Sequence, residues 1–150
     1  MNNGFIKLND DWNADPNDPR SAVADGEEAV WLRFRPNVFV FPKFKETTHL
    51  YIEFRGCSRY RFTSVNDHAW YLGQCRFSAL APDWGEFYEV TGDFRAAQNS
   101  TPWTERRGPS ARRNFLFYLR DETFECTAAD WSLRQESPAG LKLQEPFDVP

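Results

Sequence analysis

The chain has few of the residues on which catalytic sites, metal sites and disulfide frameworks depend. Its 150 residues include only two histidines, His49 and His68, and three cysteines, Cys57, Cys75 and Cys126. The cysteines are odd in number and widely spaced, which argues against a disulfide framework and against a zinc site. Neither histidine stands at a spacing that predicts a nucleophile–base pair. We therefore expect no metal, no cofactor and no identifiable catalytic residue.

Long apolar runs and an export signal are also missing. No stretch approaches the roughly 18 apolar residues that a membrane helix needs, so we expect no membrane partner. Residues 1–5 lack the basic start and apolar stretch of a signal peptide. Cys75 and Cys126 each alternate with phenylalanines, a pattern typical of small buried thiols on the apolar side of a strand. Together these features predict a cytoplasmic protein.

Lysine is scarce, whereas arginine and aromatic residues are abundant. Of the 18 basic residues 14 are arginine, whose planar guanidinium suits contacts with carboxylates, phosphates and aromatic rings. The net charge of −4 argues against a nucleic-acid partner. The 14 Phe, 6 Trp and 5 Tyr can fill a core although only 41% of the residues are hydrophobic, because each ring buries about 150–250 Å².

Alternation of apolar and polar residues is the clearest structural signal. Val30, Leu32 and Phe34 alternate with polar or aromatic residues, which is typical of a strand with one buried face. Similar patterns predict strands at 4–8, 30–35, 37–41, 50–55, 59–63, 69–72, 74–79, 86–92, 114–120, 123–127 and 131–135. Single helical turns are expected only at 94–98 and 127–131. The prediction is one all-β domain spanning 1–150, an antiparallel β-sandwich or partly closed β-barrel of about eight to ten short strands.

Three segments are predicted to be loops or surface chain: 9–26, 95–113 and the tail 137–150. The first begins with alternate Asp and Asn residues, as a calcium loop does. However, Pro16 stands where that motif needs glycine and Ala22 where it needs glutamate, so we expect Asx and Pro turns instead. Within the second loop, residues 101–113 contain Trp103 and four arginines. This stretch could either bind an anionic or aromatic partner or dock onto the acidic segment 79–94.

Arginines recur at the polar positions of the predicted strands. If these strands are neighbours, their arginines share one sheet face with aromatic residues, and such a face can bind an anionic group through charge and stacking. The candidate ligand-binding residues are Trp31, Arg33, Arg35, Tyr51, Arg55, Arg59, Arg61, Arg76 and Trp103. Two other interpretations are ion pairing with Glu53, Glu86, Glu89 and Glu125, or a face lining a barrel interior.

The leading functional hypothesis is a non-catalytic binding protein that uses this arginine- and aromatic-bearing face for an anionic small molecule or a protein partner. The alternative is a small hydrolase- or isomerase-like enzyme with carboxylates in a barrel mouth, since two carboxylates can perform acid–base chemistry. A third possibility is a subunit whose aromatic surface is buried by self-association. The ligand, the oligomeric state and the strand order stay open at this point.

Overall fold

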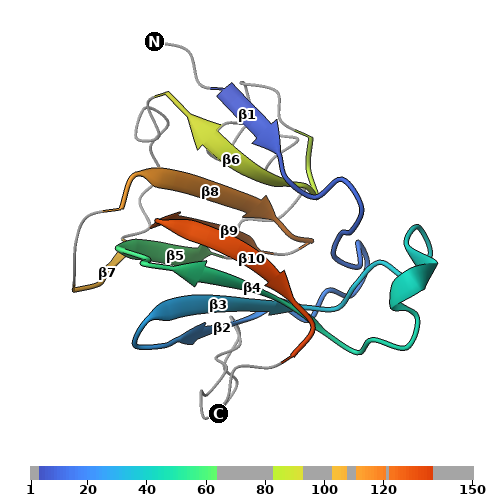
Figure 1. Cartoon of the computed structure of the whole chain (residues 1–150). Coiled ribbons are helices and arrows are strands. Elements are labelled where there is room, and N and C mark those ends of the chain that lie inside the picture. Colours follow the sequence, from blue (N-terminus) through green and yellow to red (C-terminus); the bar gives the residue numbers. More distant parts are fainter. Residues whose placement is uncertain (1–3, 64–82, 93–102, 108–110, 121, 137–150) are drawn as a thin grey trace.

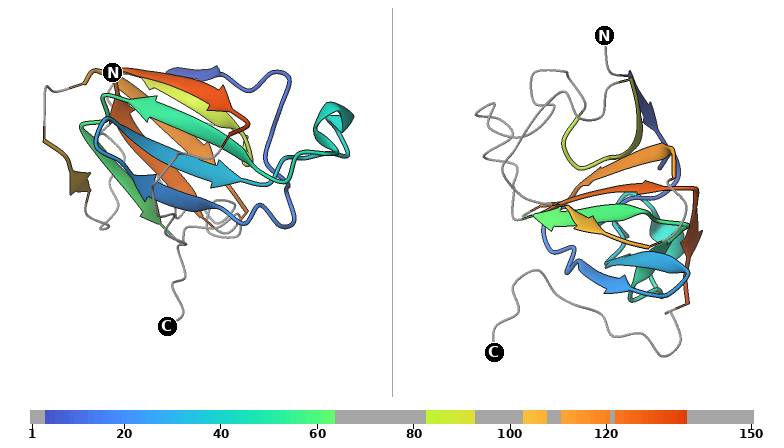
Figure 2. Two further views of the ribbon diagram at one scale, coloured as in Figure 1. Left: turned by 60° about the horizontal axis from the view of Figure 1, so that its bottom comes forward. Right: turned by 90° about the vertical axis from the view of Figure 1, so that its left-hand side faces the viewer.

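Two antiparallel sheets packed face to face make up the protein (Figures 1 and 2). The computed structural model describes residues 4–63, 83–92, 103–107, 111–120 and 122–136. Within these residues there are ten strands and one short 3-10 helix. The predicted all-β antiparallel fold is confirmed, and the arrangement of its sheets is that of a sandwich.

The larger sheet has six strands in the order β1-β6-β8-β9-β5-β7. Their bounds are Gly4–Lys7 for β1, Phe87–Thr91 for β6, Arg113–Tyr118 for β8, Thr123–Ala128 for β9, Arg59–Thr63 for β5 and Thr104–Glu105 for β7. The smaller sheet has four strands in the order β10-β4-β3-β2. These are Asp130–Arg134 for β10, Leu50–Arg55 for β4, Ala29–Phe34 for β3 and Ala22–Asp25 for β2.

Along the described strands, the chain passes between the sheets three times, at β1 to β2, β4 to β5 and β9 to β10. The last two passages are adjacent, the first of them being β4 to β5 and the second β9 to β10. Gly56 makes the first passage with a φ of 60°, and a β-carbon there would lie 3.0 Å from the Ala129 side chain of the second. Glycine tolerates this φ without the steric penalty of other residues. The Ala129 amide donates to the Arg55 carbonyl over 2.9 Å, so the two passages are joined.

The core lies between the sheets and is rich in phenylalanine. The inward positions of β3, namely Val30, Leu32 and Phe34, are fully buried, as their alternation predicts. Phe54 of β4 stacks on Phe124 of β9 with ring centroids 5.3 Å apart, which brings the two sheets into direct contact. Other buried rings from the larger sheet are Phe87, Phe115 and Phe117.

Cys57 and Cys126 are buried free thiols. The alternation with phenylalanines predicts this for Cys126, whereas no such pattern surrounds Cys57. Burial raises the pKa of the Cys126 thiol well above its ordinary value. A hydrogen bond with Cys126 lowers the pKa of Cys57. Both side chains pack in the main core as small apolar groups.

The predicted strand at 37–41 is wrong. Residues 38–40 form a turn, and a 3-10 helix, η1 (Pro42–Phe44), follows. The Asn37 side-chain carbonyl accepts the backbone N–H groups of Phe39 and Val40, each over 3.2 Å. These bonds close an Asx turn, which competes with strand pairing. Pro42 lacks the N–H that a paired strand uses.

Other boundaries also differ from the predictions. Strand β2 lies inside the predicted loop 9–26, and β7 lies inside the predicted loop 95–113. The helical turn expected at 127–131 is wrong, because these residues end β9 and begin β10. The predicted elements at 69–72, 74–79 and 94–98, the tail 137–150, and the residues His68, Cys75 and Arg76 lie outside the described residues.

Candidate functional site

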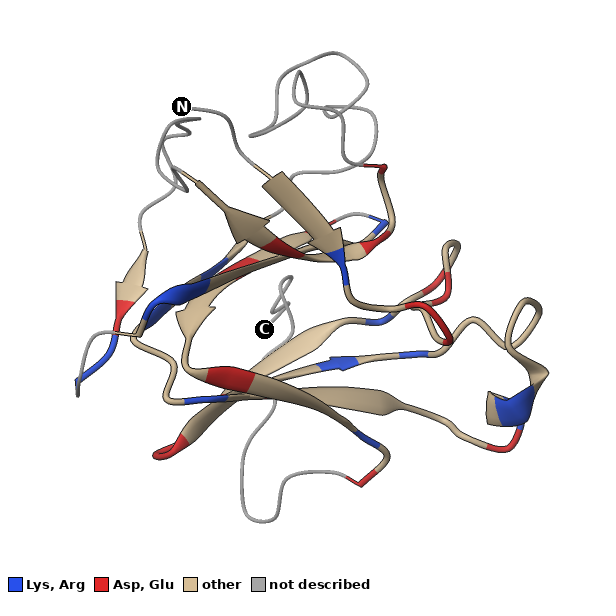
Figure 3. Ribbon diagram, turned by 45° about the horizontal axis from the view of Figure 1, so that its top comes forward, with Lys and Arg blue, Asp and Glu red and all other residues tan. Residues whose placement is uncertain are grey.

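The predicted single arginine face is wrong, because the arginines are divided between the two sheets (Figure 3). Arg33 and Arg55 lie on the smaller sheet, whereas Arg59 and Arg61 lie on β5 of the larger one. Strand β4 pairs with β3 and β10, and β5 pairs with β9 and β7. Consecutive strands β4 and β5 are therefore not neighbours, and the predicted residues form separate groups.

Trp103, Arg59 and Arg61 form one group on the outer face of the larger sheet. The guanidinium carbons of both arginines lie 4.3 Å from the Trp103 ring centroid, a cation–π arrangement. Arg61 Nε donates to Glu125 Oε2 over 2.5 Å, and these two side chains are only 4% and 2% exposed. Trp103 also packs against the cluster that contains Tyr88. Trp103 is therefore docked onto the protein, over two arginines of β5 and against a cluster to which Tyr88 of the acidic segment 79–94 belongs.

Arg55 belongs to a network of ion pairs that joins the two sheets. It donates to Glu53 over 2.8 Å and to Asp130 over 2.7 Å. Asp130 of the smaller sheet also pairs with Arg113 of the larger sheet over 3.3 Å, and Arg113 pairs with Glu89 over 2.9 Å. The hydrogen bond from Arg55 is the main cause that lowers the pKa of Asp130. This group therefore fits the ion-pairing interpretation.

Trp31, Arg33 and Tyr51 lie side by side on the outer face of the smaller sheet. Arg33 stands opposite Tyr51 on β4, and Trp31 stands opposite Glu53. Arg33 Nη2 donates to the backbone carbonyl of Arg20 over 3.2 Å. Through this bond the sheet face is connected to a cavity at the end of the sandwich.

Among the predicted arginines that the structure describes, only Arg35 lines this cavity, which we call the end cavity. It has a volume of about 680 Å³. Its walls come from segment 15–20, the residues after β3, and the residues between η1 and β4. The lining residues are Asp15, Arg20, Arg35, Pro36, Val38, Phe39, Lys45, Glu46, Thr47, Thr48 and His49.

Backbone hydrogen bonds fix the segment that brings Arg20 to Arg35. The Arg35 amide donates to the Pro19 carbonyl, and the Asp15 amide donates to the Arg35 carbonyl, each over 2.7 Å. The Asp15 carboxylate accepts the amides of Asn17 and Asp18 over 2.8 and 3.1 Å. These are the Asx turns that the sequence predicts for this loop.

Arg20 has a strained backbone. Its φ is 45°, and no other non-glycine residue that the structure describes has a positive φ. Such a conformation costs of order 1–3 kcal/mol and is enriched at functional sites. The bond from Arg33 to the Arg20 carbonyl stabilises it.

Asp18 lies between the two guanidiniums of the end cavity. Its Oδ2 is 3.1 Å from Arg20 Nε and 3.0 Å from Arg35 Nη1. The side chains of Arg20 and Arg35 are 64% and 40% exposed, and each guanidinium has five N–H donors. Among the described residues Lys45 makes no ion pair. Donors of all three cations therefore remain available to an anion.

Arg20 and Lys45 were not predicted as site residues. Neither occupies a polar position of a predicted strand, so the alternation pattern cannot identify them. Pro19 before Arg20 is a turn signal, but it does not indicate that the turn lies beside Arg35.

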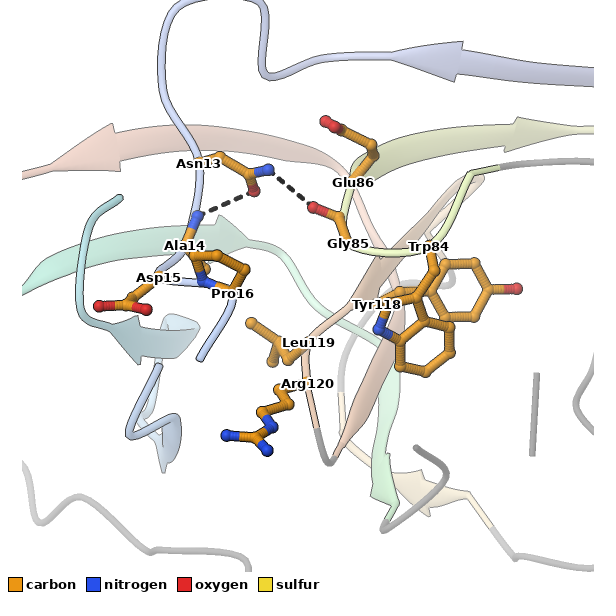
Figure 4. Close-up of a pocket in the computed structure, with 10 residues that line it drawn as sticks. All are labelled: Asn13, Ala14, Asp15, Pro16, Trp84, Gly85, Glu86, Tyr118, Leu119 and Arg120. Carbon is orange, nitrogen blue, oxygen red and sulfur yellow. Dashed lines mark hydrogen bonds between the residues drawn. The ribbon is translucent and has the colours of Figure 1, made fainter. Parts of the chain in front are cut away.

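A second, smaller pocket of about 220 Å³ lies between segment 13–16 and the larger sheet (Figure 4). Trp84 stacks on Tyr118 at one side of it, with centroids 4.6 Å apart. Asn13 donates to the Gly85 carbonyl over 2.8 Å, and Arg120 donates to the Asn17 carbonyl. Asn13 and Arg120 thus connect protein segments, and Arg120, an exposed residue, is the one cation among the lining residues, whereas three cations line the end cavity.

The carboxylates considered for the enzyme alternative hold ion pairs. Glu53 pairs with Arg55, Glu86 with Lys7, Glu89 with Arg113 and Glu125 with Arg61. In the part of the chain that the structure describes, no group of three or more His, Cys, Asp or Glu side chains is placed to hold a metal ion. The described residues also contain no helix of the length and apolarity required to cross a membrane.

Comparisons of the chain with protein-family models, with curated proteins and with solved structures found no match in any of the three.

Proposed function

We propose that the protein is a non-catalytic binding protein whose end cavity holds an anionic group of its ligand. The observation that carries this proposal is the convergence of Arg20, Arg35 and Lys45 in one cavity. Guanidinium groups bind carboxylates and phosphates with charge-assisted hydrogen bonds, which are about twice as strong as neutral ones.

Two features support a role in binding. Arg20 is held in a strained conformation, and Arg33 contributes a bond to its carbonyl. The cations are also partly exposed, whereas Arg61 is buried in an ion pair with Glu125. A buried ion pair stabilises the fold. An exposed cation at a cavity can release a carboxylate of the protein and bind an anionic group of a ligand in its place. A cytoplasmic location is part of the proposal, supported by the free thiols of Cys57 and Cys126.

Titration with inorganic phosphate tests the proposal. We expect the amide NMR signals around residues 15–20 and 45–49 to shift, with an affinity that falls as NaCl is raised from 50 to 500 mM. Arg35→Ala removes a charged donor worth about 1.5–3 kcal/mol, so it should weaken phosphate binding roughly tenfold or more. Arg20→Ala should act in the same direction.

Arg134→Ala is the matched control. Arg134 is also an exposed, ion-paired arginine, bonded to Glu53 on the smaller sheet, and it does not line the end cavity. Its removal should leave phosphate binding unchanged. Equal losses for Arg35→Ala and Arg134→Ala, or no phosphate-induced shifts near the cavity, would show that the proposal is wrong.

A further inference from the structure

The wall of the end cavity next to the cations is apolar and exposed. Phe39 is 82% exposed and Val40 64%, and the other exposed large apolar side chain among the described residues is Ile6 at 52%. Phe39 and Val38 line the same cavity as Arg20, Arg35 and Lys45. We call residues 38–40 the apolar tip. It belongs to the segment between β3 and β4 that projects beyond the end of the sheets (Figure 1).

We propose that the end cavity and the apolar tip together receive a segment of a partner protein in which an acidic side chain stands next to a bulky apolar one. This inference rests on the proposed function and specifies its ligand. A bare inorganic anion uses the cations alone. A ligand that contacts both the cations and the apolar tip must carry a negative charge and an apolar group a short distance apart.

The apolar tip is held in place rather than being a frayed loop. The Asn37 side chain accepts the amides of Phe39 and Val40, and the Phe41 amide donates to the Asn37 carbonyl over 3.1 Å. Phe44 of η1, four residues after the end of the apolar tip, is buried in the main core at 5% exposure. Ordering an interface has an entropic cost at binding. A turn that already presents Phe39 avoids much of that cost.

The exposure of Phe39 is itself informative. Large apolar side chains that are held out of a well-packed core mark interaction sites when they gather with others. Phe, Tyr and Trp are also enriched at the centres of protein interfaces, where they act as anchors. Here the apolar tip lies beside cations, a combination that matches an acidic and apolar peptide segment.

The distribution of charge favours a protein over an anionic lipid surface. Lys43 near the tip is neutralised by Asp11, over 3.0 Å, and Asp11 is 77% exposed. Asp15 and Glu46 line the cavity beside the cations. A flat negative membrane would meet these carboxylates together with the cations. A single acidic side chain can instead bind the guanidinium donors of Arg20 and Arg35 that Asp18 does not use, in a cavity that Asp11 does not line.

The test measures the binding of three capped dipeptides to the full chain, from the NMR shifts that each dipeptide causes. They are acetyl-Glu-Phe-amide, acetyl-Glu-Ala-amide and acetyl-Gln-Phe-amide. We expect the Glu-Phe probe to bind at least fivefold more tightly than either of the others. Phe39→Ser should abolish its advantage over Glu-Ala, and it should weaken phosphate binding far less than Arg35→Ala does. Ile6→Ser, which removes an exposed apolar side chain from β1, is the control and should change neither.

Each outcome decides a different statement. If phosphate binds through Arg35 but Phe39→Ser leaves the Glu-Phe advantage intact, the peptide inference is overturned and the proposed function stands. If phosphate fails to bind, the proposed function is wrong, and the peptide inference that rests on it is overturned with it. If vesicles of phosphatidylserine and phosphatidylcholine bind in a Phe39-dependent manner while the dipeptides do not, the tip contacts lipid and the inference is overturned.

Discussion

At the scale of single residues, the most consequential pair is Arg61 with Glu125. Both side chains are almost completely buried on the outer face of the larger sheet, and Arg61 also lies over the Trp103 ring. Removing two charges from water is costly, and their attraction must offset that cost. If one partner is removed, the other remains as a buried, uncompensated charge.

We therefore predict that Arg61→Met lowers the free energy of unfolding by about 3–5 kcal/mol. The double variant Arg61→Met with Glu125→Leu should recover most of the loss, because it removes both charges. Urea denaturation measures all three proteins. Lys43→Ala is the control: the Lys43–Asp11 pair is exposed on both sides, at 52% and 77%, so its loss should cost below about 1 kcal/mol. A cost for Arg61→Met as small as this would contradict the prediction.

At the scale of elements, Asp130 connects the beginning of β10 to both sheets. It accepts hydrogen bonds from Arg55 of β4 and from Arg113 of β8. The pKa of Asp130 is lowered from the ordinary value of 3.8 for an aspartate, mainly by the Arg55 hydrogen bond and next by the bond from the Trp131 amide. A lowered pKa in the folded state means that ionised Asp130 stabilises the fold.

The pH dependence of Asp130→Asn follows from the direction of this shift. The stabilisation is complete above the unfolded pKa near 3.8 and is lost as the pH falls through the lower, folded value. At pH 7 we expect Asp130→Asn to lower the free energy of unfolding. The loss should be less than about 1 kcal/mol, because the carboxylate is half exposed.

Melting curves of wild type and Asp130→Asn between pH 2 and 7 test this. The two melting temperatures should converge at the acid end of the series. A constant difference across the whole range would show that the charge of Asp130 contributes nothing.

At the scale of the whole molecule, Trp12 joins the two sheets through the core. It is 3% exposed, and its ring lies 5.5 Å from that of Phe34 in the smaller sheet and 5.9 Å from that of Phe87 in the larger sheet. The residue comes from the loop before β2, close to segment 15–20 of the end cavity. The packing of this loop therefore contributes both to the core and to the position of the site.

Trp12→Ala should lower the free energy of unfolding by about 3–5 kcal/mol, the range for removing a large buried ring. Trp12→Phe should cost less, because it keeps most of the apolar contact. Guanidinium denaturation followed by circular dichroism measures both. Phe39→Ala is a matched exposed aromatic and should change stability by below about 0.5 kcal/mol. A loss for Trp12→Ala of the same small size would place the indole outside the core.

The strands and the candidate site differ in how far they are predictable. Strands β3, β4, β5, β8 and β9 follow their predicted ranges to within a residue or two. Alternation reports the burial of a strand's two faces, which is a local property. The run at 37–41 has strand-forming residues, but the Asn37 side chain bonds the turn instead. Of the predicted site residues, Arg35 lines the end cavity, and Arg59 and Arg61 are committed to Trp103 and Glu125.

The alternation of apolar and polar residues is sufficient to predict an antiparallel β fold with an apolar, aromatic core, because successive side chains of a strand point to opposite faces. The division of β4 and β5 between two sheets is visible only in the folded chain. The folded chain also makes Trp12 a core residue and brings Arg20 to Arg35 beside Phe39. Strand pairing and loop packing depend on contacts between residues far apart in the chain. The local periodicity of the sequence does not indicate which distant residues make those contacts.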